Sequence, residues 1–302
     1  MHSHTIVPGE GAYYPLDQVN TVAATPSTTS FENIKINVKL PYLRLHHLPE
    51  FKKIKGNNKP IALVGGGPSV KNHIEEIKKH KTIICCGSPH DFLIENKITP
   101  TYAVICDPDP VSINYFQKLD TEVKYLVASS AHKTLIDHFK ESQVVLWHCH
   151  SDDYNGKIEN IEVDYQAIGG GCTVGLRSIC IAMMLGYTNI HFYGFDSCLS
   201  EGDISYPYEI STEEEKATMK DVYTIKVGDL SGLKGHEKEF RCYGYQLAQA
   251  YHFKQFYQNY GNSFNPTFHG EGLLPELMKM IRQEELQKTG YTTTVLASKF
   301  IH

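Results

Sequence analysis

The chain has 302 residues, a formal net charge of −5 at pH 7 and 21% charged residues. A chain of this length can bury a sizeable core, and it more often forms one large domain with elaborations than two full-size domains. The charge leaves no basic surplus to neutralise nucleic-acid phosphates, so a dedicated nucleic-acid binder is disfavoured. No run of about 18 apolar residues could span a bilayer, and the first thirty residues show no signal-peptide pattern.

The eight cysteines lie mostly inside apolar runs such as residues 82–86 and form no Cys-x-x-Cys pair. Cysteines placed in this way behave as small core hydrophobes in a reducing compartment. Together with the missing membrane span, this distribution predicts a cytoplasmic protein.

Residues 1–58 are predicted to be an N-terminal arm and linker. Up to about residue 32 the segment is rich in Ser, Thr, Pro and Gly and lacks periodicity, which is typical of an extended or disordered leader. Tyr13 and Tyr14 are large rings to leave in water, so packing of this arm on a partner subunit in a homo-oligomer is a hypothesis for it.

Residues 59–200 are predicted to be a Rossmann-like nucleotide-binding core. Short apolar runs alternate there with amphipathic segments, as in βαβ units with a parallel sheet. The expected strands are Pro60–Val64, Thr82–Cys86, Tyr102–Cys106, Lys124–Ala128, Val144–Trp147 and Asn189–Tyr193, with helices starting near Ser69, Asp91, Val111, Ala131 and Thr173. Such doubly wound sheets bind ligands beyond the carboxyl ends of their strands.

The alternation fades after Asp196. Residues 201–238 carry acidic and Gly-rich stretches and are predicted to be an insertion or lid. Residues 239–302 are predicted to be a C-terminal helical part that completes the core, with helical spacing in Arg241–Tyr260 and Leu273–Gln287. The expected fold is therefore α/β: a doubly wound, mostly parallel Rossmann-like sheet with an insertion or lid and C-terminal helices.

A glycine turn follows the first predicted strand: Gly65, Gly66, Gly67, Pro68 and Ser69. Glycines let a backbone approach a ligand, Ser69 can cap the next helix, and Pro68 suits a helix start. These features predict an anion site at a helix N-terminus, although a tight turn without ligand is the simpler alternative. Two known phosphate-binding motifs are absent from this turn. A dinucleotide fingerprint needs a third Gly where this chain has Val70, and a Walker A loop needs Gly-Lys-Ser/Thr.

Other candidates follow later strands at the same predicted edge. Asp107 and Asp109 could ligate Mg²⁺ or hydrogen-bond a ribose or acceptor hydroxyl; alternatively, Asp109 only caps the next helix. Gly87 and Ser88 follow the second strand and are candidate nucleotide contacts.

A second glycine turn, with Gly170, Gly171 and Thr173, opens another helix and offers further N–H groups, or serves close packing alone. Thr173 could cap that helix or contact a ligand. Asp196 follows the strand Asn189–Tyr193 and is a candidate catalytic group or an ordinary turn residue. His269 could act as a general acid or base, although a lone histidine is more often structural.

The order of these motifs resembles that in the 6-hydroxymethylpterin diphosphokinase-like (MptE-like) proteins and the Maf flagellin glycosyltransferases, which are related to bacterial sialyltransferases. The likeness covers roughly residues 59–275 and also includes Asp91-Phe92-Leu93-Ile94 and His269-Gly270-Glu271-Gly272. It implies that Gly65, Gly67, Pro68 and Ser69 line a donor phosphate. It also implies that Asp107, Gly170, Gly171, Thr173 and Asp196 border the same cleft. Relatives commonly carry Asn where this chain has Gly87, which leaves the donor open.

The resemblance implies two chemistries. A glycosyltransferase would bind a nucleotide-activated, CMP-sugar-like donor, stabilise the departing phosphate and use Asp196 or His269 as a base toward an unknown acceptor. A diphosphokinase would move a pyrophosphoryl group from ATP with Mg²⁺ on Asp107 or Asp109. The glycine loops offer no lysine, which favours glycosyl transfer. No tightly bound cofactor is expected, and a nucleotide-binding module without catalysis is the third hypothesis.

Overall fold

The computed structural model describes residues 4–6, 21–23, 27–51, 57–153, 155–162, 166–208, 222–227 and 238–289. Its centre is a sheet of nine strands in which every neighbouring pair is parallel. The strands are β3 (Leu43–Arg44), β4 (Asn57–Val64), β5 (Ile83–Cys86), β6 (Tyr102–Ile105), β7 (Lys124–Ala128), β8 (Val144–Cys149), β9 (Ala167–Ile168), β10 (Tyr187–Tyr193) and β13 (Asn265–Phe268).

The sheet has the order β13-β10-β4-β5-β6-β7-β8-β3, with β9 also paired to β8. From β4 to β8 each strand is added on the same side of the previous one, and the chain then returns to place β10 on the other side of β4. The direction of winding therefore reverses between β4 and β10, which is where doubly wound sheets bind ligands. The α/β fold and all six predicted strands are confirmed, with small shifts at their ends.

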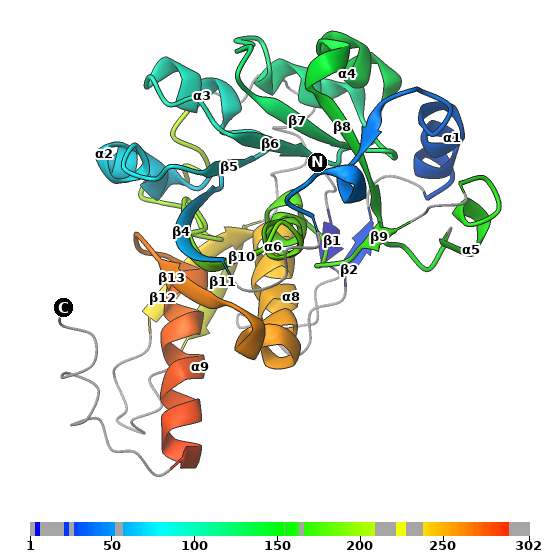
Figure 1. The fold of residues 1–302 in the computed structure, drawn as a ribbon. Helices are drawn as coiled ribbons and strands as arrows, with labels where there is room; N and C mark the ends of the chain where they lie inside the picture. Colours follow the sequence, from blue (N-terminus) through cyan, green and yellow to red (C-terminus); the bar gives the residue numbers. More distant parts are fainter. Residues whose placement is uncertain are drawn as a thin grey trace.

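Helices cover both faces of the sheet (Figure 1). One face packs on the segments that follow β4 to β7, and the other on helices from later in the chain. The first group is η3 (Pro68–His73), α2 (Ile74–Ile77), α3 (His90–Glu95), η4 (Pro110–Tyr115) and α4 (Lys133–His138); the second is α6 (Val174–Met184), α8 (Gly244–Tyr260) and α9 (Leu273–Thr289). Because successive strand residues face opposite sides, Leu63 and Val64 enter different core clusters. Burial on both faces explains the continuous apolar runs of the strands.

The N-terminal segment is more ordered than the predicted arm. Helix α1 (Ser27–Asn37) lies against the core, where the buried Asn37 side chain donates from Nδ2 to the carbonyls of Ser129 and Ala131, both at 2.8 Å. The helix also buries Ile34 against Ile158, so polar bonds and a small apolar contact hold it in place. Outside the core, β1 (His4–Ile6) pairs with β2 (Thr21–Ala23). Tyr13 and Tyr14 lie outside the described residues.

The C-terminal third also differs in part from expectation. Within the predicted lid, β11 (Val222–Val227) pairs antiparallel with β12 (Lys238–Tyr243), while 209–221 and 228–237 lie outside the described residues, so a lid stays a prediction. The two predicted C-terminal helices are present as α8 and α9. Strand β13 was not expected because Pro266 interrupts a run of four residues; Pro is tolerated there because β13 is an edge strand.

Short elements complete the described chain: η2 (Leu45–His47), η5 (Glu141–Gln143), α5 (Asn155–Ile158) and η6 (Gly261–Ser263). The cysteines are free, and all except the half-buried Cys180 are buried, as the sequence predicts. Across the described helices, none has the length and apolar character needed to cross a membrane.

A buried ion pair fixes the segment after α1. Glu162 Oε1 lies 2.6 Å from Arg44 Nε, and its Oε2 lies 2.8 Å from His148 Nε2. Burial alone would raise the pKa of Glu162, but the hydrogen bonds and charges of His148 and Arg44 outweigh it and lower the pKa to about 2. The carboxylate therefore stabilises the fold above its ordinary pKa of 4.5, and this contribution is lost as pH falls toward 2.

Glu162→Gln should lower the free energy of unfolding at pH 7 by about 3 kcal/mol, since a pKa shift of one unit corresponds to about 1.4 kcal/mol. At pH 3 the loss should be clearly smaller, because the wild-type carboxylate is then losing its advantage. Urea unfolding at both pH values tests this, with the exposed Glu159→Gln as control. An equal loss at pH 7 and pH 3 would contradict the assignment.

Candidate functional site

A pocket opens where the winding of the sheet reverses. Its walls come from the turns after β4, β5, β6 and β10, from the start of α6, and from residues near 206 and 245. The empty space, with the open mouth included, is about 980 Å³. The lining residues are Gly65, Gly66, Gly67, Cys86, Gly87, Ser88, Ile105, Cys106, Asp107, Ser112, Tyr115, Phe116, Cys172, Thr173, Val174, Gly175, Gly194, Phe195, Ser197, Ser205, Tyr206, Tyr245, Gln246 and Gln249.

Two glycines allow the turns after β4 and β10 to touch. The amide of Gly65 donates to the carbonyl of Tyr193 and that of Gly67 to Gly194, both at 2.8 Å. A Cβ at Gly65 would lie 2.6 Å from the carbonyl oxygen of Gly194, and one at Gly194 would lie 2.4 Å from that of Gly65. These glycines are thus needed for backbone packing, and the amides of Gly65 and Gly67 are already bonded within the protein.

The predicted anion site at Ser69 is filled by the protein itself. Asp196 Oδ2 accepts from the amide of Ser69 at 2.7 Å, and Oδ1 accepts from its hydroxyl at 2.5 Å. Asp196 is 2% exposed; burial raises its pKa to about 6, with the Ser69 hydrogen bonds and the charge of His73 acting in the opposite direction. Neither Ser69 nor Asp196 lines the pocket, so Asp196 holds the loop in place instead of facing a ligand.

Gly65, Gly66 and Gly67 all line the pocket, and Gly66 is closely surrounded by side chains of the pocket wall. A Cβ there would lie 2.5 Å from the hydroxyl of Tyr208 and 2.8 Å from that of Ser88, which are themselves hydrogen-bonded at 2.8 Å. Gly87, in the left-handed region with φ of +71°, lines the same wall. Gly66 is thus required for the packing of Ser88 and Tyr208 against this turn.

The start of helix α6 forms the opposite wall. The hydroxyl of Thr173 accepts from the amide of Leu176 and caps the helix, as the sequence predicts. Val174 and Gly175, in the first turn, line the pocket, where helices have N–H groups without intrahelical acceptors. Gly170 and Gly171 do not line it: both have positive φ, and a Cβ at Gly170 would lie 2.9 Å from the carbonyl of Leu176, so they shape the turn.

Of the two predicted metal-binding carboxylates, Asp107 faces the pocket and Asp109 does not. Asp109 Oδ1 accepts from the amide of Val111 at 3.0 Å and caps η4, while the amide of Asp109 donates to Asp107 Oδ1 at 3.1 Å. Among the described residues, no pair of further His, Cys, Asp or Glu side chains joins either of them in a metal-binding group. Asp107 could hold Mg²⁺ only together with oxygens of a bound substrate.

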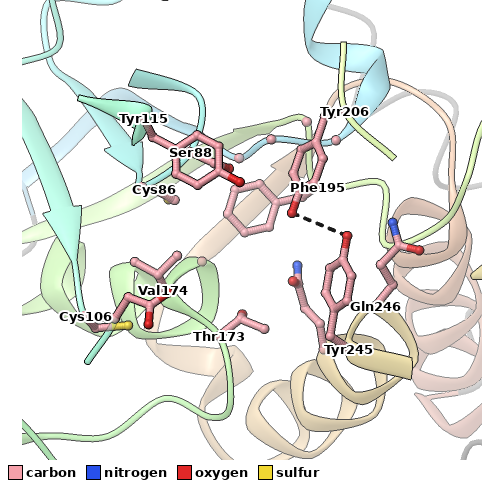
Figure 2. Close-up of a pocket in the computed structure, with 18 of the residues that line it drawn as sticks. Cys86, Ser88, Cys106, Tyr115, Thr173, Val174, Phe195, Tyr206, Tyr245 and Gln246 are labelled. Atoms are coloured by element: carbon pink, nitrogen blue, oxygen red, sulfur yellow. Dashed lines mark hydrogen bonds between the residues drawn. The ribbon is translucent and has the colours of Figure 1, made fainter. Parts of the chain in front are cut away.

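Aromatic side chains that the sequence reasoning missed make up much of the pocket wall. Figure 2 shows Tyr206 and Tyr245 with their hydroxyl groups turned toward each other, 3.4 Å apart, beside the ring of Phe195. Burial, followed by the proximity of Tyr206, raises the pKa of Tyr245 well above its ordinary value, so its phenol stays protonated. In the sequence, Tyr245 is one of several aromatic residues in a predicted helix, and Tyr206 lies in the predicted insertion, so neither pattern indicates a pocket residue.

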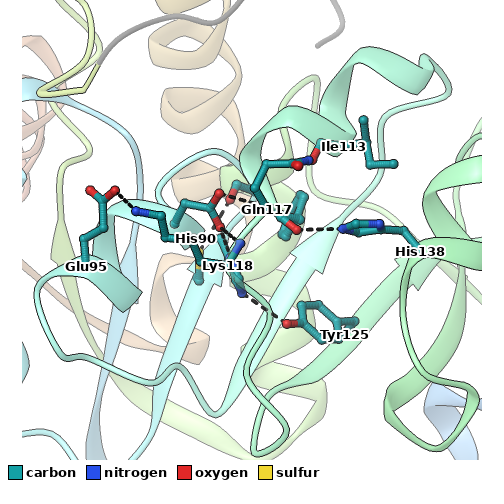
Figure 3. A network of polar contacts seen from close by, with 11 residues as sticks. His90, Glu95, Ile113, Gln117, Lys118, Tyr125 and His138 are labelled. Carbon is teal, nitrogen blue, oxygen red and sulfur yellow. Dashed lines mark hydrogen bonds and ion pairs between the residues drawn. The ribbon is translucent and has the colours of Figure 1, made fainter.

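A polar network holds the wall formed by Tyr115 and Phe116 (Figure 3). Asp91 accepts from the amides of Gln117 and Lys118 at 2.8 and 3.1 Å, and the ring of His90 lies 2.8 Å from the same carboxylate. His138 is bonded to the carbonyl of Phe116 at 2.8 Å. Asp91, one of the residues behind the family resemblance, therefore acts by fixing the backbone behind the pocket.

His269 lies apart from the pocket. It follows β13, stacks on Tyr193 with ring centroids 4.3 Å apart, and its Nε2 lies 2.8 Å from His191 Nδ1. Of the residues predicted from the sequence, the structure gathers Gly65, Gly66, Gly67, Gly87, Ser88, Asp107 and Thr173 around the pocket; Pro68, Ser69, Asp109, Gly170, Gly171, Asp196 and His269 do not line it.

The fold thus defines a Rossmann-like α/β protein with a pocket at its switch point. The chain belongs to the family described as 6-hydroxymethylpterin diphosphokinase MptE-like, whose model matches residues 29–202, more than half of the chain. The match begins inside α1, so part of the predicted arm lies within the family segment. No curated protein matches the sequence.

Similar folds occur among solved structures. The MAf glycosyltransferase from Magnetospirillum magneticum AMB-1 aligns with a TM-score of 0.59 and 15% identity, covering 81% of this chain but only 37% of that one. A mammalian sialyltransferase aligns with a TM-score of 0.42 and 11% identity over 82% of this chain and 80% of that one. The sialyltransferase CstII from Campylobacter jejuni, in complex with CMP-3FNeuAc, aligns with a TM-score of 0.36 and 16% identity over 70% and 80%.

Relative to the wild-type value at the same pH, the free energy of unfolding of Asp196→Asn should be higher at pH 7 than at pH 4. The folded pKa of about 6 lies above the ordinary 3.8, so the folded state binds the proton more tightly and wild-type stability falls as pH rises through this window. The difference corresponds to about 3 kcal/mol. Urea midpoints at pH 4 and pH 7 measure it, with the fully exposed Asp152→Asn as control. A variant with the same pH dependence as wild type would show that Asp196 titrates normally.

Proposed function

We propose that this chain is a nucleotide-dependent transferase, and specifically a glycosyltransferase whose donor is a nucleotide-activated sugar of the CMP-sugar type. The chemical composition of the pocket lining supports this proposal. The lining residues that the structure describes include aromatic rings, hydroxyl groups, glycines and one carboxyl group, but no Lys or Arg. Arg177, close behind the second glycine turn, donates to the carbonyl of Ile168 at 2.9 Å and does not line the pocket.

A weakly charged donor fits such a pocket better than a triphosphate. Triphosphates are usually held by lysine or arginine together with Mg²⁺ and its carboxylate ligands. A single phosphodiester group can instead be held by backbone N–H groups at a helix N-terminus, here the first turn of α6 opposite Gly66.

The leaving phosphate needs hydrogen-bond donors as its charge develops. The phenols of Tyr206 and Tyr245 belong to the pocket lining, where Tyr245 donates to Tyr206 at 3.4 Å, and the raised pKa of Tyr245 keeps its phenol protonated. We assign them this role, because donors placed where charge develops lower the barrier most. Asp107 is the carboxylate of the pocket, and we assign it the role of accepting the hydroxyl proton of the acceptor. Asp196 and His269, the bases expected from the sequence, do not line the pocket.

Tyr245→Phe and Tyr206→Phe should each reduce the rate of CMP release from a CMP-sugar by roughly 100-fold while leaving KM nearly unchanged, since each removes one hydrogen-bond donor to the leaving group. Tyr251→Phe is the matched control: it lies on the same helix α8, does not line the pocket, and its hydroxyl accepts from Gln255 at 2.8 Å. Unchanged rates in both pocket variants would exclude this role.

Diphosphoryl transfer from ATP is the second candidate, because the family description names a diphosphokinase. It would use Asp107 as a ligand of substrate-bound Mg²⁺, with Asp109 only behind it as the cap of η4. A binding module without catalysis is the third; it predicts that Asp107→Ala leaves ligand affinity intact and that no turnover exists to lose.

Ligand-dependent thermal unfolding separates these candidates. We expect CMP without Mg²⁺ to raise Tm by several degrees, since a ligand at 100 times its Kd adds about 2.7 kcal/mol to the stability. UDP, GDP, ATP and GTP, each with and without Mg²⁺, complete the panel. Stabilisation only by ATP or GTP with Mg²⁺ would overturn glycosyl transfer in favour of the diphosphokinase.

A further inference from the structure

A group of histidines lies on the other side of β10, at the edge that β13 completes. His73 and Glu76 come from η3 and α2, His191 from β10 and His269 from the turn after β13. None of these four residues lines the pocket. The proposed transferase activity assigns no role to these four residues.

Three of these side chains point ligating atoms toward one place. Glu76 Oε2 lies 3.1 Å from His73 Nδ1 and 3.5 Å from His269 Nδ1, and the three atoms all lie within 4.8 Å of one another. A tetrahedral zinc ion about 2.0 to 2.1 Å from nitrogen and oxygen ligands places those ligands about 3.3 Å apart. The two distances to Glu76 are thus close to those of a coordination shell, and the ligand atoms of His73 and His269, within 4.8 Å of each other, would have to move closer together by at most about 1.5 Å.

The surroundings of His269 also fit a metal ligand. Its second ring nitrogen, Nε2, is bonded to His191 Nδ1 at 2.8 Å, and metal-bound imidazoles usually have such a partner on the far nitrogen. The ring is held flat against Tyr193, with an interplanar angle of 11°.

We propose that His73, Glu76 and His269 form a binding site for a divalent transition-metal ion of the zinc type, with water completing the coordination. Two imidazoles and one carboxylate suit zinc and its neighbours, whereas Mg²⁺ and Ca²⁺ prefer oxygen ligands alone. Glu76 is about half exposed, so an ion can reach the site from solvent.

The ion would clamp two segments together. His73 and Glu76 belong to the segment that follows the glycine turn, and His269 begins the turn between β13 and α9. The contact between them is already close, because a Cβ at Gly270 would lie 2.5 Å from the hydroxyl of Ser69 and 3.5 Å from His73 Nε2. Metal binding would thereby hold the C-terminal turn against Ser69, the residue that anchors Asp196.

Zinc titration of the full chain, first freed of metal with a chelator, tests the proposal. The titration runs in competition with a coloured chelator and compares variants, since the chain has 16 histidines and weaker background binding is expected. Wild type should bind one more equivalent of Zn²⁺ than Glu76→Gln and His269→Ala. His191→Ala should keep the site but weaken it roughly 10- to 100-fold, as expected for a partner of a ligand.

His80→Ala is the matched control, because its ring belongs to the same aromatic group but is bonded to the hydroxyl of Tyr193 at 3.0 Å. It should bind zinc as wild type does. Circular dichroism confirms that each variant is folded, and Glu76→Gln is nearly isosteric. Equal stoichiometry and affinity in wild type, Glu76→Gln and His269→Ala would overturn the proposal, and so would a loss confined to His269→Ala.

Discussion

The crossing of the turns after β4 and β10 is the constraint on which the site depends. Gly65 and Gly194 bring two backbone segments from distant parts of the sequence closer than any side chain would permit. This contact brings the glycine turn after β4 beside the end of β10, at the point where the sheet changes its direction of winding. The pocket, its α6 wall and the anchoring of Ser69 by Asp196 all follow from that closeness.

The crossing also changes how the glycine-rich loop is understood. Such a loop before a helix is normally a place where an anion meets free N–H groups. Here the anion nearest Ser69 is the carboxylate of Asp196, so the N–H group of Ser69 binds a side chain of the protein itself. The backbone groups that line the pocket are instead those at the start of α6, in Val174 and Gly175.

Much of the fold could be predicted from the sequence, because each central strand is a continuous apolar run with helical spacing after it. Local patterns also identified the caps formed by Asp109 and Thr173, whose partners lie two and three residues away. The pairing of Asp196 with Ser69, at a separation of 127 residues, leaves no local trace. For the same reason, the sequence did not show that His269 would lie beside His191 rather than in the pocket, or that Tyr206 would meet Tyr245.

The order of the strands along the chain determines when the sheet and the pocket can form during synthesis on the ribosome. Domains generally fold as their residues emerge, at about 5 to 20 residues per second. Strands β4 to β8 emerge one after another and can pair at once, but β10 gains its outer neighbour only when residues 265–268 have been made. Until Tyr245 has emerged, one wall of the pocket does not exist, and the apolar face that α8 and α9 later cover stays open. The pocket can therefore be completed only after most of the strands of the sheet have been made.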